Sequence, residues 1–269
     1  MRRFLILVIS IIMIIVTGCS DRGLTPDDLP TPASREAVGT SVALTRIAPP
    51  RGFNEFVSFP AIDDRLPVVS NWQYELTLRF SGVFTGTTRP AEGVTTMNAW
   101  YDLVGQRQRV VIERSGNLLT SEDETTVQSE GVRIIDNTFL VQDNVCVAQN
   151  TEDAEALADL RASDFIGGVD RATPAGAPER INGEEVWPYA VALEQIIRPP
   201  ALDEGTVTGF QAELWVAPEH DAVIRYYVTL NIENAIIFNS SAPLTGTVTI
   251  LYDLTNIGVD PNITRPFGC

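Results

Sequence analysis

Side chains suited to acid–base or nucleophilic chemistry are sparse in this chain. It holds a single histidine, His220, which follows Pro218 and Glu219 in a predicted turn between two strands. A catalytic base at His220 would need Asp221 to orient its ring, but adjacent turn residues rarely face each other. With no other histidine and no Gly-x-Ser-x-Gly motif, the sequence lacks the usual base and nucleophile of a catalytic triad. We therefore interpret His220 as an exposed turn residue.

Carboxylates are plentiful, but they gather in predicted loops beside Gly, Ser or Pro. The groups are Glu122-Asp123-Glu124, Glu184-Glu185 and Asp203-Glu204. A glycosidase would need two such acids facing each other in one cleft, which the sequence leaves open. The spacings of a calcium loop, a Cys/His zinc cluster and a phosphate-binding glycine loop do not occur. We expect solvated loop charge, no enzyme activity, no cofactor and no metal site.

The first residues predict export and lipid attachment. Met1-Arg2-Arg3 is a positive start, an apolar run extends from Phe4 to Val16, and Thr17-Gly18-Cys19 follows. This run is too short to span a bilayer, as is typical of a secretory signal. Its ending resembles the lipobox of bacterial lipoproteins, which implies an acylated Cys19 that becomes the first mature residue. An ordinary signal peptide or an uncleaved anchor helix is the alternative.

Cys146 and Cys269 remain once Cys19 carries lipid. In an oxidising exported compartment, an even pair of cysteines usually forms a disulfide. The bridge would tie the last residue of the chain to the body of the protein. Two free thiols are the alternative.

The chain is strongly acidic, with a formal net charge of −16. Such a surface repels nucleic acid and anionic lipid head groups, so neither is expected as a partner. A membrane contact through Cys19 is expected instead, on the outer face of the cytoplasmic membrane or, alternatively, on the outer membrane. An envelope protein partner and a lipid or lipoprotein cargo stay open.

The chain divides into residues 1–18 as signal peptide, 19–50 as a flexible proline-rich tether and 51–269 as a single domain. From Asn71 onward, apolar and polar residues alternate as in strands that have one dry face. Turns around Gly105 and at Pro218–Asp221 predict hairpins. Thr151–Phe165 has the spacing of a helix, and Ser34–Arg46 a weaker one. The pattern predicts an α+β fold dominated by one antiparallel sheet.

The strands share a broad aromatic and aliphatic face that must be buried. Either loops complete an ordinary core over it, or sheet and helices enclose a cavity for an apolar ligand. The candidate cavity residues are Trp72, Leu76, Phe80, Tyr101, Ile112, Trp187, Val191, Leu214, Tyr226, Leu230, Ile250 and Tyr252.

The order of motifs in the second half is that of a known superfamily. Glu179–Tyr189 gives a short strand, Asn-Gly and an aromatic strand; Ala212–Val216 and Val223–Tyr227 flank the Pro-Glu-His-Asp turn; Val248–Ile257 closes the series. This order resembles the LolA/LolB-like superfamily, closest in arrangement to LppX/LprG-type lipoproteins. The resemblance covers about residues 70 to 258. It implies a curved antiparallel half-barrel covered by a few helices, an apolar cavity, and no catalytic residues.

We therefore expect a membrane-anchored envelope lipoprotein that binds or carries an acyl lipid or lipoprotein in a cavity, without chemistry. The alternative is a protein- or glycan-binding sensory module with a solid core. The cysteine pair matches no motif of the superfamily.

Overall fold

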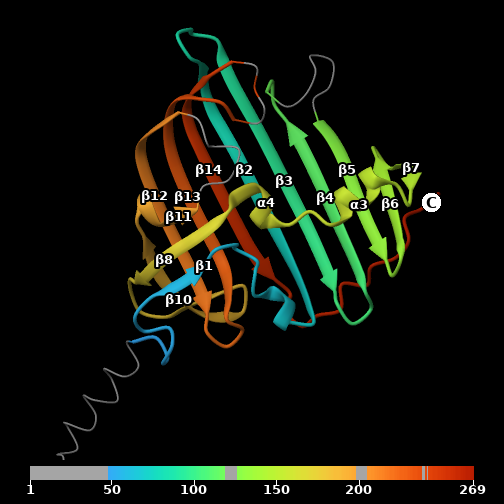
Figure 1. Cartoon of the computed structure of the whole chain (residues 1–269), viewed down its shortest axis with the longest axis horizontal. Coiled ribbons are helices and arrows are strands. Elements are labelled where there is room, and N and C mark those ends of the chain that lie inside the picture. The colour runs from blue at the N-terminus through green and yellow to red at the C-terminus, as the bar shows by residue number, and fades with distance from the viewer. Residues whose placement is uncertain (1–47, 119–125, 198–204, 238–239, 241) are drawn as a thin grey trace, which may run out of the picture. The chain divides into compact units, whose positions relative to one another are not determined.

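The alternating segments fold as one antiparallel sheet in the computed structural model, which describes residues 48–118, 126–197, 205–237, 240 and 242–269 (Figure 1). The described part belongs to one compact unit, Arg46–Cys269. Its strands are β1 (Val57–Phe59), β2 (Asn71–Phe84), β3 (Pro90–Asp102), β4 (Arg107–Ser115), β5 (Thr126–Ile134), β6 (Asn137–Gln142), β7 (Val145–Gln149), β8 (Gly168–Pro174), β9 (Glu179–Ile181), β10 (Glu184–Val191), β11 (Ile196–Ile197), β12 (Thr206–Ala217), β13 (Ala222–Ala235) and β14 (Leu244–Thr255).

Every recorded strand pairing is antiparallel, and the order is β1-β8-β10-β12-β13-β14-β2-β3-β4-β5-β6-β7, with β9 on β10 and β11 on β8. The last strand, β14, therefore lies beside β2 rather than at an edge. Both expected hairpins form, between β3 and β4 and between β12 and β13. The predicted α+β class, one curved antiparallel sheet covered by a few helices, is confirmed.

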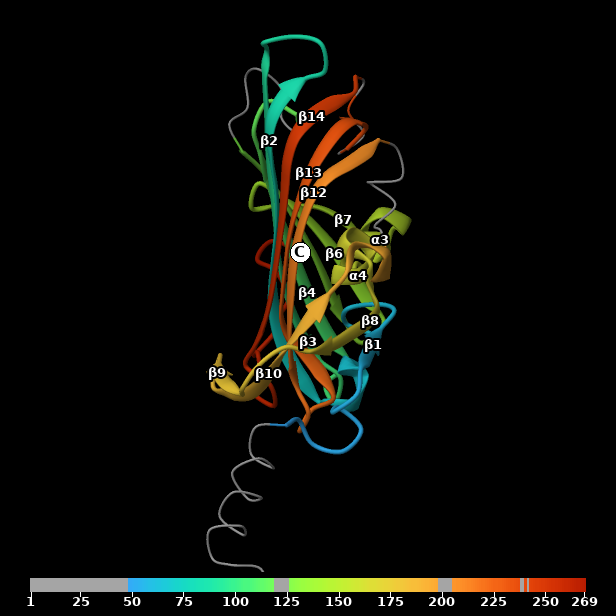
Figure 2. The ribbon, with the colours of Figure 1, turned by 90° about the vertical axis from the view of Figure 1, so that its left-hand side faces the viewer.

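The helical cover lies where the chain crosses from one edge of the sheet to the other. Between β7 and β8 come α3 (Glu152–Ala158) and α4 (Ala162–Ile166); two 3-10 turns, η2 (Leu66–Val68) and η3 (Leu193–Gln195), lie elsewhere. Figure 2 shows α3, α4, β1 and β8 on one side of the long strands. We call this side of the sheet the inner face and the opposite side the outer face.

The prediction of one continuous helix over Thr151–Phe165 is wrong in its middle. The helix ends after Ala158 and restarts at Ala162. Asp164 accepts the Arg161 N–H at 2.8 Å, which caps a new helix start at that position. The Tyr101 hydroxyl donates to the Leu160 carbonyl at 3.0 Å, a bond that a continuous helix would compete for.

Alternation along the strands places the large side chains in one core on the inner face. In β2, Trp72, Tyr74, Leu76, Leu78 and Phe80 are all buried, and the residues between them are half-buried or exposed. Gly131 of β5 has a role in this packing, because a Cβ there would lie 2.5 Å from the Ala158 backbone nitrogen of α3. The lack of a side chain lets α3 approach the sheet closely.

The outer face carries a smaller cluster near the chain end. Val132, Phe139 and Ile263 are buried together there, with Trp100, Ile134 and Cys269 against them. The predicted disulfide is present between Cys146 and Cys269, with Cα atoms 5.4 Å apart. It joins β7 to the last residue, as expected.

Several predictions lie outside the described residues. These are the signal peptide with Cys19, most of the tether, the Ser34–Arg46 helix and the acidic groups at 122–124 and 203–204. None of the described helices has the length and apolar composition needed to cross a bilayer.

Candidate functional site

A cavity of about 430 Å³ lies on the inner face, between the sheet and the α3–α4 connection. Its lining comes from segments far apart in the sequence: the stretch from β1 to η2, strands β2 to β4, and the α3–α4 link. The lining residues are Asp63, Leu66, Pro67, Trp72, Tyr101, Leu103, Gln108, Asp159 and Arg161. This volume falls in the range of about 300–1,000 Å³ that is usual for small-molecule sites.

One wall of the cavity is aromatic. Trp72 and Tyr101, on adjacent strands, stack with ring centroids 4.8 Å apart and an interplanar angle of 15°. Burial raises the pKa of Tyr101 to about 12, so its hydroxyl stays protonated and donates to Leu160. The Trp72 Nε1–H is buried and has no hydrogen-bond partner among the described residues. A buried donor without a partner costs about 1–3 kcal/mol, which a ligand acceptor would offset.

The cover of the cavity is the short link from Ala158 to Arg161, and polar side chains of the sheet hold it. Gln108 of β4 donates to the Ala158 carbonyl at 2.7 Å and to the Asp159 carboxylate at 2.6 Å. Arg133 of β5 pairs with Asp159 at 2.7 Å. The link is therefore attached to the sheet by side-chain contacts and not by strand pairing.

Asp63 is the buried carboxylate of the site. Its residue is 6 % exposed, and Oδ2 accepts the Ala162 N–H at 3.0 Å. Oδ1 is buried without a partner in the described structure. Burial raises the pKa of the Asp63 carboxyl above its ordinary value of 3.8, although neighbouring Ser163 and Arg161 act in the opposite direction.

The cavity thus offers an apolar aromatic wall together with unpartnered polar atoms on two of its lining residues. None of the described residues that line it is a histidine or a cysteine, and the Asp159 carboxylate is already engaged by Gln108 and Arg133. This arrangement suits the recognition of a small molecule that has both apolar and polar parts.

The twelve predicted cavity residues divide into two groups. Trp72 and Tyr101 line the cavity, and the other ten are buried in the same hydrophobic core cluster, namely Leu76, Phe80, Ile112, Trp187, Val191, Leu214, Tyr226, Leu230, Ile250 and Tyr252. Tyr226 and Tyr252 have buried hydroxyl groups without a partner among the described residues.

The polar residues of the site were missed from the sequence. Asp63 and Gln108 lie in separate segments, Asp159 and Arg161 share the α3–α4 link, and no spacing along the chain connects the three segments. The one signal in the sequence is that Asp63 lies between the apolar residues Ile62 and Leu66, both of which the structure buries.

A second hollow, of about 500 Å³, lies on the outer face beneath the C-terminal segment. Its lining includes the Arg109–Glu130 ion pair, Trp100 and residues 261–267. None of the buried unpartnered side-chain atoms of the described residues belongs to its lining. The inner cavity is therefore the better candidate for a ligand site.

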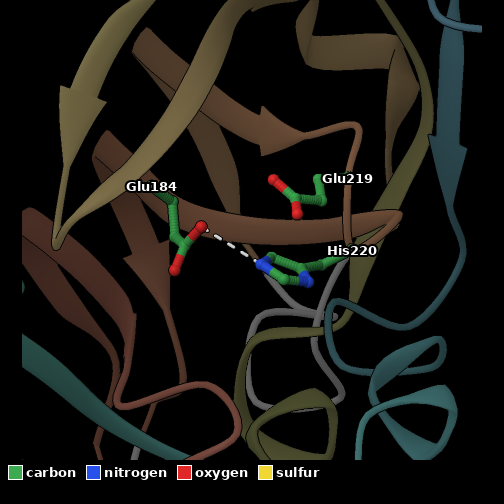
Figure 3. Close-up of side chains that lie close together, drawn as sticks. All are labelled: Glu184, Glu219 and His220. Atoms are coloured by element: carbon green, nitrogen blue, oxygen red, sulfur yellow. Dashed lines mark hydrogen bonds and ion pairs between the residues drawn. The ribbon is translucent and has the colours of Figure 1, made fainter.

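His220 lies in the predicted turn and Asp221 does not orient it, as expected, but the prediction that the residue is exposed is wrong. Its side chain is 23 % exposed, and Nε2 lies 3.1 Å from Oε2 of Glu184 (Figure 3). Asp221 does not orient the ring, because its carboxylate pairs with Arg65.

Comparisons with known proteins leave the family open. No family model matches the chain, and no curated protein matches it. A solved structure of a DUF1329 family protein from Desulfovibrio piger is 10% identical, with 75% of this chain and 90% of that chain covered and a TM-score of 0.22. At this TM-score the likeness carries no argument, and membership of the LolA/LolB-like superfamily stays a prediction.

Proposed function

We propose that this protein binds a hydrophobic ligand with a polar end in the inner cavity and releases it unchanged. The observation that carries the proposal is a cavity with a stacked aromatic wall, two of whose lining residues, Trp72 and Asp63, each have a buried polar atom with no partner among the described residues. Apolar surface moved from water onto this wall gains about 25 cal/mol per Å². The polar end of the ligand would satisfy Trp72 Nε1 and Asp63 Oδ1.

The size of the cavity restricts the cargo to one small amphipathic molecule or one acyl chain. The ligand would enter when the Ala158–Arg161 link moves away from the sheet. The side-chain hydrogen bonds that hold this link contribute about 0.5–1.5 kcal/mol each. Opening such a link costs less than separating paired strands.

We also propose a location for the protein at a membrane, and this part of the proposal rests on the first 19 residues. Acyl chains on Cys19 would anchor the exported protein at the outer face of the cytoplasmic membrane, at a lipid source, with the outer membrane as the alternative. The tether would let the domain reach away from the bilayer.

The second candidate function is a protein- or glycan-binding module that carries no cargo. The burial of ten of the predicted cavity residues in one core cluster favours it, because a filled core leaves little room for a long lipid. The two candidates differ in whether the exported protein carries a bound small molecule.

The test is native mass spectrometry with organic extraction, on the exported chain with Cys19 replaced. Leu103→Trp places a bulky ring at the cavity, whereas Val104→Trp places the same ring on an adjacent side chain that is 81% exposed and outside the lining. We expect bound mass in the unmodified domain and in Val104→Trp, and its loss in Leu103→Trp. An unloaded protein, even after incubation with total membrane lipid, would favour the protein- or glycan-binding module.

A further inference from the structure

A second group of polar side chains lies at the end of the sheet where two turns meet. Glu184 stands at the start of β10, and Glu219 and His220 belong to the β12–β13 turn. One ligand atom from each of the three lies within 4.8 Å of the others. Figure 3 shows the three side chains converging, with the imidazole and the Glu184 carboxylate already in contact.

The turns that carry these side chains are held from both sides. Asn182 and Gly183 form the β9–β10 turn with φ of 54° and 94°, which is typical of a tight hairpin. The Asn182 amide also donates to the Leu254 carbonyl at 2.8 Å and so ties the turn to β14. The backbone of Glu184 is therefore fixed before any ligand arrives.

The β12–β13 turn is fixed in the same way. The His220 N–H donates to the Ala217 carbonyl at 3.2 Å, and Asp221 at its end has a φ of 48°. Arg65 pairs with Asp221 and also donates to the Ser58 carbonyl at 2.8 Å. Arg65 thus attaches the turn to β1. Its positive charge is paired with Asp221 and not with Glu184 or Glu219.

We propose that Glu184, Glu219 and His220 bind a divalent transition-metal ion of borderline softness, with Zn²⁺ as the reference ion. One imidazole nitrogen and two carboxylate oxygens are ligands that Zn²⁺ takes, whereas Ca²⁺ and Mg²⁺ prefer oxygen ligands alone. The ion would replace the His220–Glu184 hydrogen bond and balance two negative charges that otherwise repel. Three protein ligands leave a fourth position for water or an outside donor.

The absence of a metal motif in the sequence does not conflict with this site. Glu184 and Glu219 are far apart in the chain, and the pairing of β10 with β12 brings their turns together. The proposal is independent of the inner cavity, whose lining shares none of these residues.

The first test uses the fact that His220 is the only histidine. We would add Zn²⁺ to the full-length protein, purified in detergent without a histidine tag and labelled with ¹⁵N, and record the imidazole nitrogens by NMR. A stoichiometric shift of Nε2 that reports coordination is expected. An unchanged imidazole at saturating Zn²⁺ would overturn the proposal.

The second test separates a built site from general attraction to an acidic protein. Isothermal titration should show one Zn²⁺ per chain, weakened more than about tenfold by His220→Gln or Glu184→Gln, since losing even an outer-shell partner costs 10–100-fold. Glu185→Gln removes the same charge one residue away and should leave the affinity unchanged. Equal losses in all three variants, or Ca²⁺ binding as tightly as Zn²⁺, would overturn the proposal. Circular dichroism melting of each variant checks that the fold is retained.

Discussion

The two faces of the sheet are built from the same strands but are stabilised differently. On the inner face, Tyr226 and Tyr252 pair across β13 and β14 within a continuous apolar core. One residue away, on the outer face, Arg225 and Asp253 pair as an ion pair with 2.6 Å between Nε and Oδ1. The inner face gains from apolar burial, and the outer face depends on local pairs, a small cluster and one covalent bond. The inner cavity therefore adjoins a continuous apolar core, whereas the outer hollow lies over an ion pair and the C-terminal segment.

The largest effect is expected from the covalent bond of the outer face. The disulfide closes a loop with a sequence separation of 123. Its loss should lower the free energy of unfolding by up to about 5 kcal/mol in the chain-entropy model. Urea unfolding of the Cys146→Ser, Cys269→Ser double variant measures this. An unchanged midpoint would mean that the Val132–Phe139–Ile263 cluster holds the chain end without a cross-link.

The same substitution on each face compares the faces directly. Leu214 is fully buried on the inner face, and Leu251 is half-buried on the outer face of β14. Leu214→Ala should cost about 2–5 kcal/mol, because it removes apolar contacts and leaves a cavity. Leu251→Ala should cost less, and equal losses in a denaturant titration would remove the distinction between the faces.

The buried carboxylate of the inner cavity should make stability depend on pH. The folded-state pKa of Asp63 is raised, so its protonated carboxyl group adds to the free energy of unfolding. This added stability is fully present below about pH 3.8 and is lost as pH rises through the folded-state pKa. Each pKa unit of difference corresponds to about 1.4 kcal/mol. Relative to wild type, Asp63→Asn should gain stability as pH rises from 4, because the amide does not ionise.

Thermal unfolding across pH measures this difference, and Asp64→Asn on the adjacent exposed residue is the matched control. A difference between Asp63→Asn and wild type that is constant with pH would contradict the burial of the Asp63 charge. Added ligand that donates to Oδ1 should reduce the pH dependence of the wild type.

The smallest effect is expected for an ion pair of the outer face. Arg225 and Asp253 have side chains that are 35% and 20% exposed, respectively. A double-mutant cycle of Arg225→Gln and Asp253→Asn should give a coupling below about 1 kcal/mol that falls with added salt. A coupling of several kcal/mol would show that the outer face is as dependent on its pairs as the inner face is on its core.

The residues of the two candidate sites show where prediction from the sequence ended. Trp72 and Tyr101 were identified, because strand alternation assigns them to the dry face. Gln108 and Asp159 were not, because one lies in a strand among polar residues and the other in a predicted helix. His220 was assigned to the correct turn, but nothing near it in the chain indicated Glu184 as its partner.

By itself, the sequence determined the long alternating strands β2, β3, β4, β10, β12, β13 and β14, both hairpins and the burial of all twelve predicted residues, because a period of two and turn residues act over a few positions. It did not indicate β1, β8 or β11. The parity of the cysteines determined the disulfide. Only the tertiary structure decided the break between α3 and α4, the cavity around Asp63 and the meeting of Glu184 with His220. Those features arise where segments that are distant in the chain cross or pair. Because the residues in such contacts are far apart in the sequence, no local pattern indicates that they will meet.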